Sequence, residues 1–354
     1  MKFICFLLLL FLQVEVKAQK PKQVYEDRVN IIQKNINLYF TDQAKGLYFE
    51  STAKQQENPH SWLWPLCALI QSANEMEVLN KNIKYMMPVE RAIDQYYSTV
   101  APAPAYQDYP LKEKLSSRFY DDNQWIALAY LDAYNRTKEK SYLKKSKDIY
   151  RFLLTGYDDK AGGGLYWKEG DKNSKNTCSN GPNVLVSLQL YKITKEKKYL
   201  DTALLVYNWT NKHLRAATGI FYDAIKIPSL KVDEGTYTYN TGTMLQSNVL
   251  LYEITSDKKY LEEAKVIAAA AENHFYKNNK LPDHYWFNAV LLRGYMELFK
   301  IEKKSSRLKF IIDDAERIWN EERDAQNLLG RGKEKTLLMQ AGIQEIYARL
   351  ATIN

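Results

Sequence analysis

The chain has 354 residues, of which 45% are hydrophobic and 26% charged, and this composition predicts a globular protein with a large core. Its formal net charge of +8 is spread over lysine-rich turns rather than a basic stripe with interleaved aromatic residues, which argues against nucleic acid as a partner. Beyond the first twenty residues, two cysteines, Cys67 and Cys178, and four scattered histidines form no recognisable ligand spacing. We therefore expect neither a metal ion nor another cofactor.

The N-terminus has the pattern of a secretory signal peptide. Lys2 precedes the apolar run 3–12, and the small-residue site Val16-Lys17-Ala18 follows. We expect cleavage after Ala18 (signal peptide 1–18) and export to the periplasm or the outside of the cell. The apolar run is too short to remain as a membrane anchor. Residues 19–354 are predicted to form a single domain, which we expect to be monomeric.

Three segments in the middle of the chain share one pattern: an apolar helix, a polar lysine-rich turn, and a Tyr-Leu pair that begins a second helix. The tyrosines of these pairs are Tyr142, Tyr199 and Tyr260, which are 57 and 61 residues apart. A period of this length, with two helices in each unit, is typical of repeated helical hairpins.

Amphipathic stretches extend this pattern to both ends of the chain. The predicted helices span residues 24–40, 62–79, 89–100, 126–134, 144–154, 184–191, 201–213, 244–252, 262–275, 286–299, 311–322 and 337–351. Because the last helix can pair with the first, they make six helical hairpins. Hairpins that close on themselves predict an all-α fold, an (α/α)6 toroid with two concentric helix layers; an open superhelix is the structural alternative.

The connections between hairpins are long and hold most of the glycines, with many aromatic residues and amides. They span residues 101–120, 155–182, 216–242 and 277–285. In a toroid of alternating helices, these connections lie on one rim. Long loops of this composition predict the functional face.

Asp121 and Asp122 stand at the end of the first long loop, between aromatic residues, where an apolar helix begins. One interpretation is a helix N-cap followed by an acidic residue in the first turn. The other is a carboxylate pair for glycoside hydrolysis, which needs one ionised and one protonated carboxyl group. The local sequence alone leaves both interpretations open.

The other loops of this rim supply further candidates. Asn180 is either a helix cap or an amide that binds a sugar hydroxyl, and Asp223 is a third acid. The glycines 162–164 either bring Trp167 to the cavity or form a simple hairpin. Arg293, within a predicted helix, is either a cation on the helix surface or a site residue.

The segment Tyr120-Asp-Asp-Asn-Gln-Trp125, followed by Ala127-Leu-Ala129 and Asp132-Ala-Tyr134, resembles the signature of glycoside hydrolase family 76. Members of this family are retaining α-1,6-mannanases. The resemblance covers roughly residues 40–300. It continues through the glycine-rich loop and Trp167, Cys178-Ser-Asn180, Phe221-Tyr-Asp223 and Tyr239-Asn-Thr-Gly-Thr243.

This resemblance implies an (α/α)6-barrel hydrolase that cleaves α-1,6-mannosidic linkages of mannan or manno-oligosaccharides. It implies that Asp121 is the nucleophile, that Asp122 is the acid/base, and that Asp223 is needed for activity. The expected substrate-binding residues are Trp125, Asn180, Asp223, Tyr239, Asn240 and Arg293.

One segment departs from the family pattern: Phe287-Asn288-Ala289 stands where the family usually carries Phe-Lys-Gly. Two alternatives remain beside the mannanase interpretation. One is another helical-toroid carbohydrate enzyme, such as an unsaturated uronyl hydrolase, against which the contiguous aspartates argue. The other is a glycan-binding protein without catalysis, against which the intact pair also argues. Transglycosylation uses the same two carboxylates.

Overall fold

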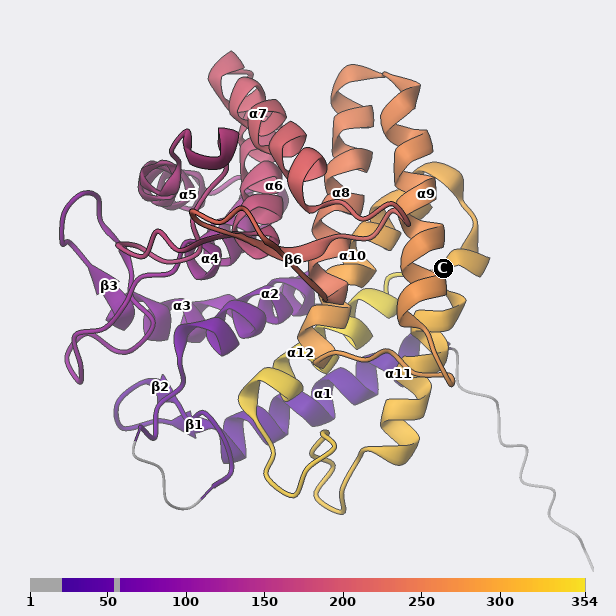
Figure 1. Cartoon of the computed structure of the whole chain (residues 1–354). Helices are drawn as coiled ribbons and strands as arrows, with labels where there is room; N and C mark the ends of the chain where they lie inside the picture. The colour runs from indigo at the N-terminus through magenta and orange to yellow at the C-terminus, as the bar shows by residue number, and fades with distance from the viewer. Residues whose placement is uncertain (1–20, 54–57, 354) are drawn as a thin grey trace, which may run out of the picture.

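The computed structural model describes residues 21–53 and 58–353 (Figure 1), so the predicted signal peptide lies outside the described residues. Within these ranges the protein is built mainly from α-helices. None of the described helices combines the length and the apolar character that a membrane span requires.

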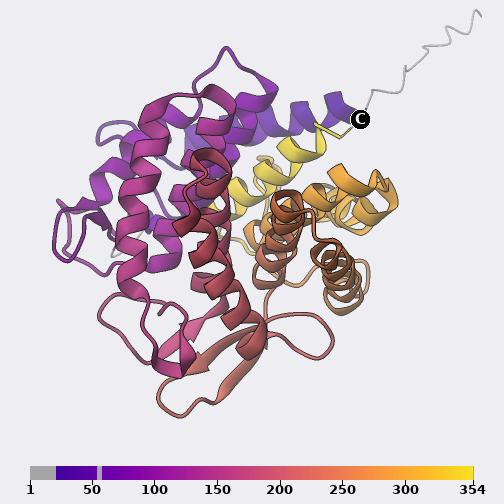
Figure 2. The same ribbon diagram turned by 90° about the horizontal axis from the view of Figure 1, so that it is seen from above.

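Six of the described helices form an inner ring, and the other six cover it (Figures 1 and 2). The inner helices are α2 (Leu63–Leu79), α4 (Tyr120–Thr137), α6 (Thr177–Thr194), α8 (Thr238–Thr255), α10 (Tyr285–Glu302) and α12 (Leu337–Leu350). The outer helices are α1 (Pro21–Tyr39), α3 (Met86–Ile93), α5 (Lys140–Leu153), α7 (Lys197–Leu214), α9 (Lys258–Phe275) and α11 (Lys309–Glu321).

The inner ring is closed. Each inner helix packs against the next in chain order, and α12 packs against both α10 and α2. The outer helices α3, α5, α7 and α9 pack on the inner helix before them, whereas α1 and α11 pack on α12. This arrangement confirms the predicted (α/α)6 toroid and excludes an open superhelix.

Burial differs between the two layers as this architecture requires. In α6, every residue from Thr177 to Leu190 is buried, which is typical of a helix surrounded by protein. In α5, the buried residues are confined to one stripe: Ser146, Ile149, Tyr150, Phe152 and Leu153. Helices with apolar residues on all sides therefore lie in the inner layer, and helices with a single apolar stripe lie in the outer layer.

The short polar turns end the inner helices. Four inner helices stop at a residue in the left-handed conformation whose backbone N–H bonds back to the last turn. These residues are Lys138, Lys195, Ser256 and Lys303. The repeat pattern thus marks helix ends on one rim, and the long loops lead to the helix starts on the other.

Several predicted boundaries were wrong. The stretches 126–134 and 184–191 are only the apolar centres of α4 and α6. The starts of these helices were not predicted, because their first turns carry polar residues without helical periodicity. The predicted helix 89–100 ends at Ile93. Beyond it, β3 (Tyr97–Ser98) pairs antiparallel with β4 (Ala105–Tyr106).

The small strands between the helices were not predicted, because they are only two to five residues long and carry no clear alternation. β1 (Thr41–Asp42) pairs with β2 (Leu47–Tyr48). β5 (Ser174–Asn176), β6 (Tyr222–Lys226) and β7 (Val232–Thr236) form a three-stranded antiparallel sheet. This sheet links the loops before α6 and α8 on the rim where those helices begin (Figure 1).

Candidate active site

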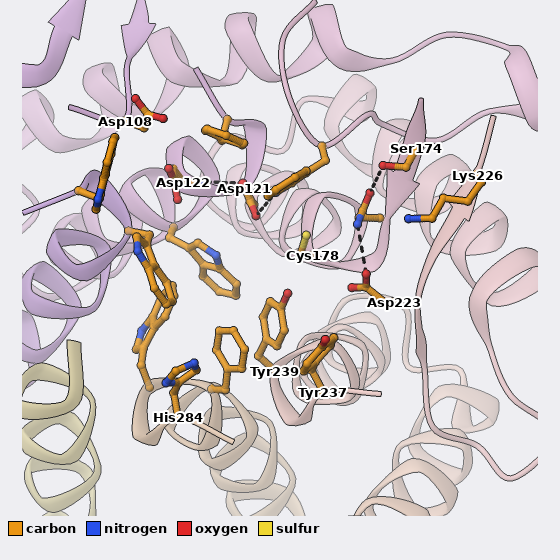
Figure 3. A pocket seen from close by; sticks show the side chains of 18 residues that line it. Asp108, Asp121, Asp122, Ser174, Cys178, Asp223, Lys226, Tyr237, Tyr239 and His284 are labelled. Carbon is orange, nitrogen blue, oxygen red and sulfur yellow. Dashed lines mark hydrogen bonds between the residues drawn. The ribbon is translucent and has the colours of Figure 1, made fainter. Parts of the chain in front are cut away.

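The N-terminal ends of the inner helices α2, α4, α6, α8 and α10 surround a cavity of about 620 Å³. Its walls are rich in aromatic side chains, which suit the apolar faces of sugar rings. The aromatic residues include Trp62, Trp64, Trp125, Trp167, Tyr239 and Phe287. Figure 3 shows this cavity with the acidic residues among them.

Asp121 and Asp122 lie in the first turn of α4, and both line the cavity. The N-cap position belongs to Phe119, which makes no side-chain cap bond. The N-cap interpretation of the pair is therefore wrong, although both aspartates are acidic first-turn residues. The N-terminal end of α4 points at the cavity, so the side chains of Asp121 and Asp122, although adjacent in sequence, both reach it.

Asp121 is held by two donors. Its Oδ1 accepts a hydrogen bond of 3.0 Å from the backbone N–H of Asp122, and its Oδ2 accepts one of 3.0 Å from the indole Nε1 of Trp167. Hydrogen bonds to a carboxylate favour its charged form. The positive end of the α4 dipole acts in the same direction.

The two carboxyl groups have different electrostatic environments. Burial raises the pKa of Asp121 to about 6, while the neighbouring thiol of Cys178 and the hydrogen bonds from Trp167 and the backbone of Asp122 favour ionisation. Burial raises the pKa of Asp122 well above its ordinary value, and the negative charges of Asp121 and Asp108 add to this effect. The stronger increase at Asp122 makes it the carboxyl group of the pair that keeps its proton to higher pH, and Asp121 the one that ionises first.

Hydrogen bonds from Lys175 hold the glycine-rich loop that carries Trp167. The ammonium of Lys175 is fully buried and donates to the carbonyls of Asp158, Lys160 and Gly163 over 2.7–2.8 Å. Gly162, Gly163 and Gly164 all have positive φ, a conformation that favours glycine. The loop thus brings Trp167 to the cavity, as one of the two sequence interpretations proposed.

Three of the predicted substrate-binding residues line the cavity. Trp125 packs edge-on against Trp286, with ring centroids 5.4 Å apart. Tyr239, in the first turn of α8, stacks on Phe287 with centroids 3.9 Å apart. Asp223 lies on β6, where burial raises the pKa of its carboxyl group.

The two predicted asparagines lie behind the cavity wall. Asn180 is inside α6 and is fully buried; its amide bonds to both the N–H and the carbonyl of Leu165 and to the carbonyl of Asn176. It is thus neither a cap nor placed to read a hydroxyl. Asn240 is also fully buried. Its amide opposes the increase in the pKa of the Asp223 carboxyl group.

Arg293 does not line the cavity. Its guanidinium is buried and pairs with Glu345, at 2.6 Å from Nε to Oε1 and 2.7 Å from Nη2 to Oε2. It borders a second cavity together with Asp132 and Gln189, at the C-terminal ends of the inner helices. Arg293 thus stands outside the cavity, bound to Glu345 of α12, with its guanidinium carbon 5.8 Å from the ring centroid of Trp125.

Cys178 and Asp108 are two of several lining residues that were not predicted as site residues. Cys178 lies beside Asp121, and Asp108 lies on the other side near Asp122 (Figure 3). Asp108 belongs to an irregular loop without motif or periodicity, so its sequence offers no signal. In the segment that departs from the family pattern, Phe287 lines the cavity, whereas Asn288 is buried and accepts a hydrogen bond from Thr238.

Residues 24–336 match the model of glycosyl hydrolase family 76. The chain belongs to this family. A similar curated relative is the mannan endo-1,6-alpha-mannosidase DCW1 of Saccharomyces cerevisiae, 26% identical over 204 residues, which are 52% of this chain and 45% of the yeast protein. The chain thus spans about half the length of the curated relatives it matches.

Solved structures of family 76 agree along nearly the whole chain. The alpha-mannanase BT2949 of Bacteroides thetaiotaomicron has a TM-score of 0.86 and 26% identity, covering 92% of this chain and 95% of that one. The mannosidase Bt3792 of the same species has a TM-score of 0.83 and 27% identity, covering 93% and 98%. The toroid of this chain is therefore the fold of solved family 76 structures.

Proposed function

We propose that this protein is a retaining glycoside hydrolase that cleaves α-1,6-mannosidic linkages in mannan and manno-oligosaccharides. The observation that carries this proposal is the pair of adjacent carboxyl groups at one aromatic cavity, in which the pKa of Asp122 is raised more strongly than that of Asp121. Family membership and the α-1,6-mannosidase activity for which the yeast relative is named support the substrate class and the linkage.

In this mechanism Asp122 donates its proton to the bridging oxygen while Asp121 attacks the anomeric carbon. The bond to the leaving sugar breaks, and a glycosyl ester with inverted configuration forms on Asp121. Asp122, now ionised, takes a proton from water as the water attacks the same carbon. The second inversion restores the α-configuration, and both carboxyl groups return to their initial states.

The surroundings of the pair fit these roles. Asp121 attacks as a carboxylate, and its two hydrogen bonds fix both oxygens. Asp122 is 8% exposed, and burial beside another negative charge keeps its proton until a better acceptor forms. The aromatic walls exclude water and offer stacking faces for neighbouring mannose units.

We also propose that the mature protein is the exported domain 19–354, acting in the periplasm or outside the cell. The N-terminal sequence supports export. Polymeric mannan does not cross a cell membrane, so an enzyme that cuts it has to meet it outside.

The test of the substrate is incubation with unbranched α-1,6-mannan, with α-1,2- and α-1,3-linked mannobiose, and with an unsaturated uronyl disaccharide. We expect short manno-oligosaccharides from the α-1,6-mannan and little product from the others. Turnover of only the unsaturated disaccharide would replace this proposal with the uronyl hydrolase alternative. Binding of mannan without any cleavage would replace it with a glycan-binding role.

A further inference from the structure

Asp108 is a third carboxylate of the cavity, outside the catalytic pair, and its backbone is fixed. Its N–H donates to the carbonyl of Ser117 over 2.8 Å, and its carbonyl accepts from the N–H of Leu63 over 2.9 Å. The second bond ties the loop to the first residue of α2. The carboxyl group of Asp108 is therefore carried by a defined loop position.

The side chain of Asp108 has an unused acceptor. Its Oδ1 is buried and has no hydrogen-bond partner among the described residues. Burial raises the pKa of this carboxyl group, while Ser116 and the charges of Lys168 and Lys114 oppose the increase. A buried acceptor without a partner costs free energy, and a bound ligand with hydroxyl donors would satisfy it.

The acidic residues lie in a definite order along the cavity. Figure 3 shows Asp108 beyond Asp122, and Asp223 beyond Asp121 at the opposite end. The charge of Asp108 acts on Asp122, which agrees with this order. In the proposed mechanism Asp122 lies next to the bridging oxygen and Asp121 next to the anomeric carbon. Asp108, on the far side of Asp122 from Asp121, therefore faces the leaving sugar.

We propose that Asp108 is a specificity-determining residue that accepts hydrogen bonds from the hydroxyl groups of the mannose unit on the leaving-group side. The inference rests on the proposed function. A mannose unit with free ring hydroxyls supplies the donors that Oδ1 lacks. A branch on one of these hydroxyls would remove a donor and place bulk against the loop, so the site selects an undecorated leaving sugar.

The experiment compares Asp108→Ala and Asp108→Asn on two substrates. One is α-1,6-mannotetraose, whose leaving group is a sugar. The other is a dinitrophenyl α-1,6-mannobioside, whose leaving group carries no sugar hydroxyls and needs little protonation. We expect kcat/KM on mannotetraose to fall about ten- to hundredfold, the range for loss of a hydrogen bond to a charged group. Activity on the aryl substrate should fall much less.

The isosteric Asp108→Asn keeps the shape of the loop, so it tests the inference even where the alanine variant folds poorly. Asp201→Asn is the control, since Asp201 pairs with Lys197 in an exposed helical turn of α7. Equal losses on both substrates, or no loss on either, would overturn the inference. A wild-type protein that leaves mannotetraose intact would overturn the proposed function itself.

A pH profile tests whether the charge of Asp108 acts on Asp122. The charged groups that act on Asp122 are Asp121 and Asp108, and those that act on Asp108 include Lys114 and Lys168. Removing the charge of Asp108 lowers the pKa of Asp122, so the basic limb of kcat/KM should move to lower pH in Asp108→Asn. An unmoved limb would contradict the position given to Asp108.

Discussion

The indole Nε1 of Trp167 donates a hydrogen bond of 3.0 Å to Oδ2 of Asp121. This bond joins the glycine-rich loop to the proposed nucleophile. The backbone carries the same link, since the carbonyl of Trp167 accepts from the N–H of Tyr120 over 3.0 Å. The first turn of α4 and the loop before α6 are therefore positioned as one unit.

Trp167→Phe should weaken catalysis through the nucleophile. The substitution keeps an aromatic ring but removes the donor to the carboxylate, so the pKa of Asp121 rises further. We expect kcat/KM to fall about tenfold and the acidic limb of the pH profile to move to higher pH. In the control Trp209→Phe, which loses a bond to the carbonyl of Ala161 in the same loop, the acidic limb should stay in place. Matching shifts in both variants would refute a direct role for the indole.

Asp122→Asn should increase stability while it abolishes hydrolysis. The raised pKa lets the folded protein keep the proton of this carboxyl group well above about pH 4, where the unfolded chain loses it. The unfolded state therefore gains stability as pH rises, and the native carboxyl group costs free energy at neutral pH. The thermal midpoint of the variant should exceed that of the wild type at pH 7, with the difference vanishing near pH 4. A constant difference across this range would rule out the raised pKa.

Gly342→Ala should destabilise the closed ring. A Cβ atom at this position of α12 would overlap the backbone of Trp286 at the start of α10. The two helices would have to separate, and we expect the free energy of unfolding to fall by about 1–3 kcal/mol. Denaturant titration measures the change. Gly332→Ala, where a Cβ atom meets ordinary contacts of 3.5 Å, should leave the midpoint unchanged.

Arg293→Met tests whether this residue acts on the substrate or on the fold. Loss of the guanidinium leaves Glu345 buried with only Arg349 as its cationic partner, at 2.8 Å. Breaking a buried pair costs about 3–5 kcal/mol, and the second arginine should keep the loss near the lower end. We expect a lower thermal midpoint with an unchanged KM, and no effect in Lys300→Met, whose pair with Glu297 is exposed. A raised KM at full stability would restore the substrate-binding prediction.

The architecture was predictable because it is repeated in the sequence. The apolar helix, the lysine-rich turn and the recurring Tyr-Leu pairs are local signals, and each marks one hairpin. The starts of the inner helices were not predictable in the same way. Residues such as Thr177 and Tyr120 belong to first turns whose polar side chains serve the cavity and the loops, so they break the apolar period.

The residues of the candidate site were likewise predictable only where the sequence carries a local signal. Asp121 and Asp122 stand in a recognisable segment, and the ring brings Trp125, Asp223 and Tyr239 to the same cavity. Asn180 and Arg293 carry side chains that suit a sugar site, but each bonds to a partner elsewhere in the fold, Leu165 and Glu345. Such pairings are tertiary and leave no local signal.

Asp121 and Asp122 have different roles in the proposed mechanism, nucleophile and acid/base. Asp122→Ala and Asp121→Ala, each incubated with a dinitrophenyl α-1,6-mannobioside and sodium azide, test this assignment through the anomeric configuration of the glycosyl azide, read by NMR. With Asp122→Ala, the ester on Asp121 still forms, and azide should displace it to give the α-azide. With Asp121→Ala, azide can only displace the leaving group directly and should give the β-azide. The reverse assignment of products, or wild-type activity in both variants, would contradict the account.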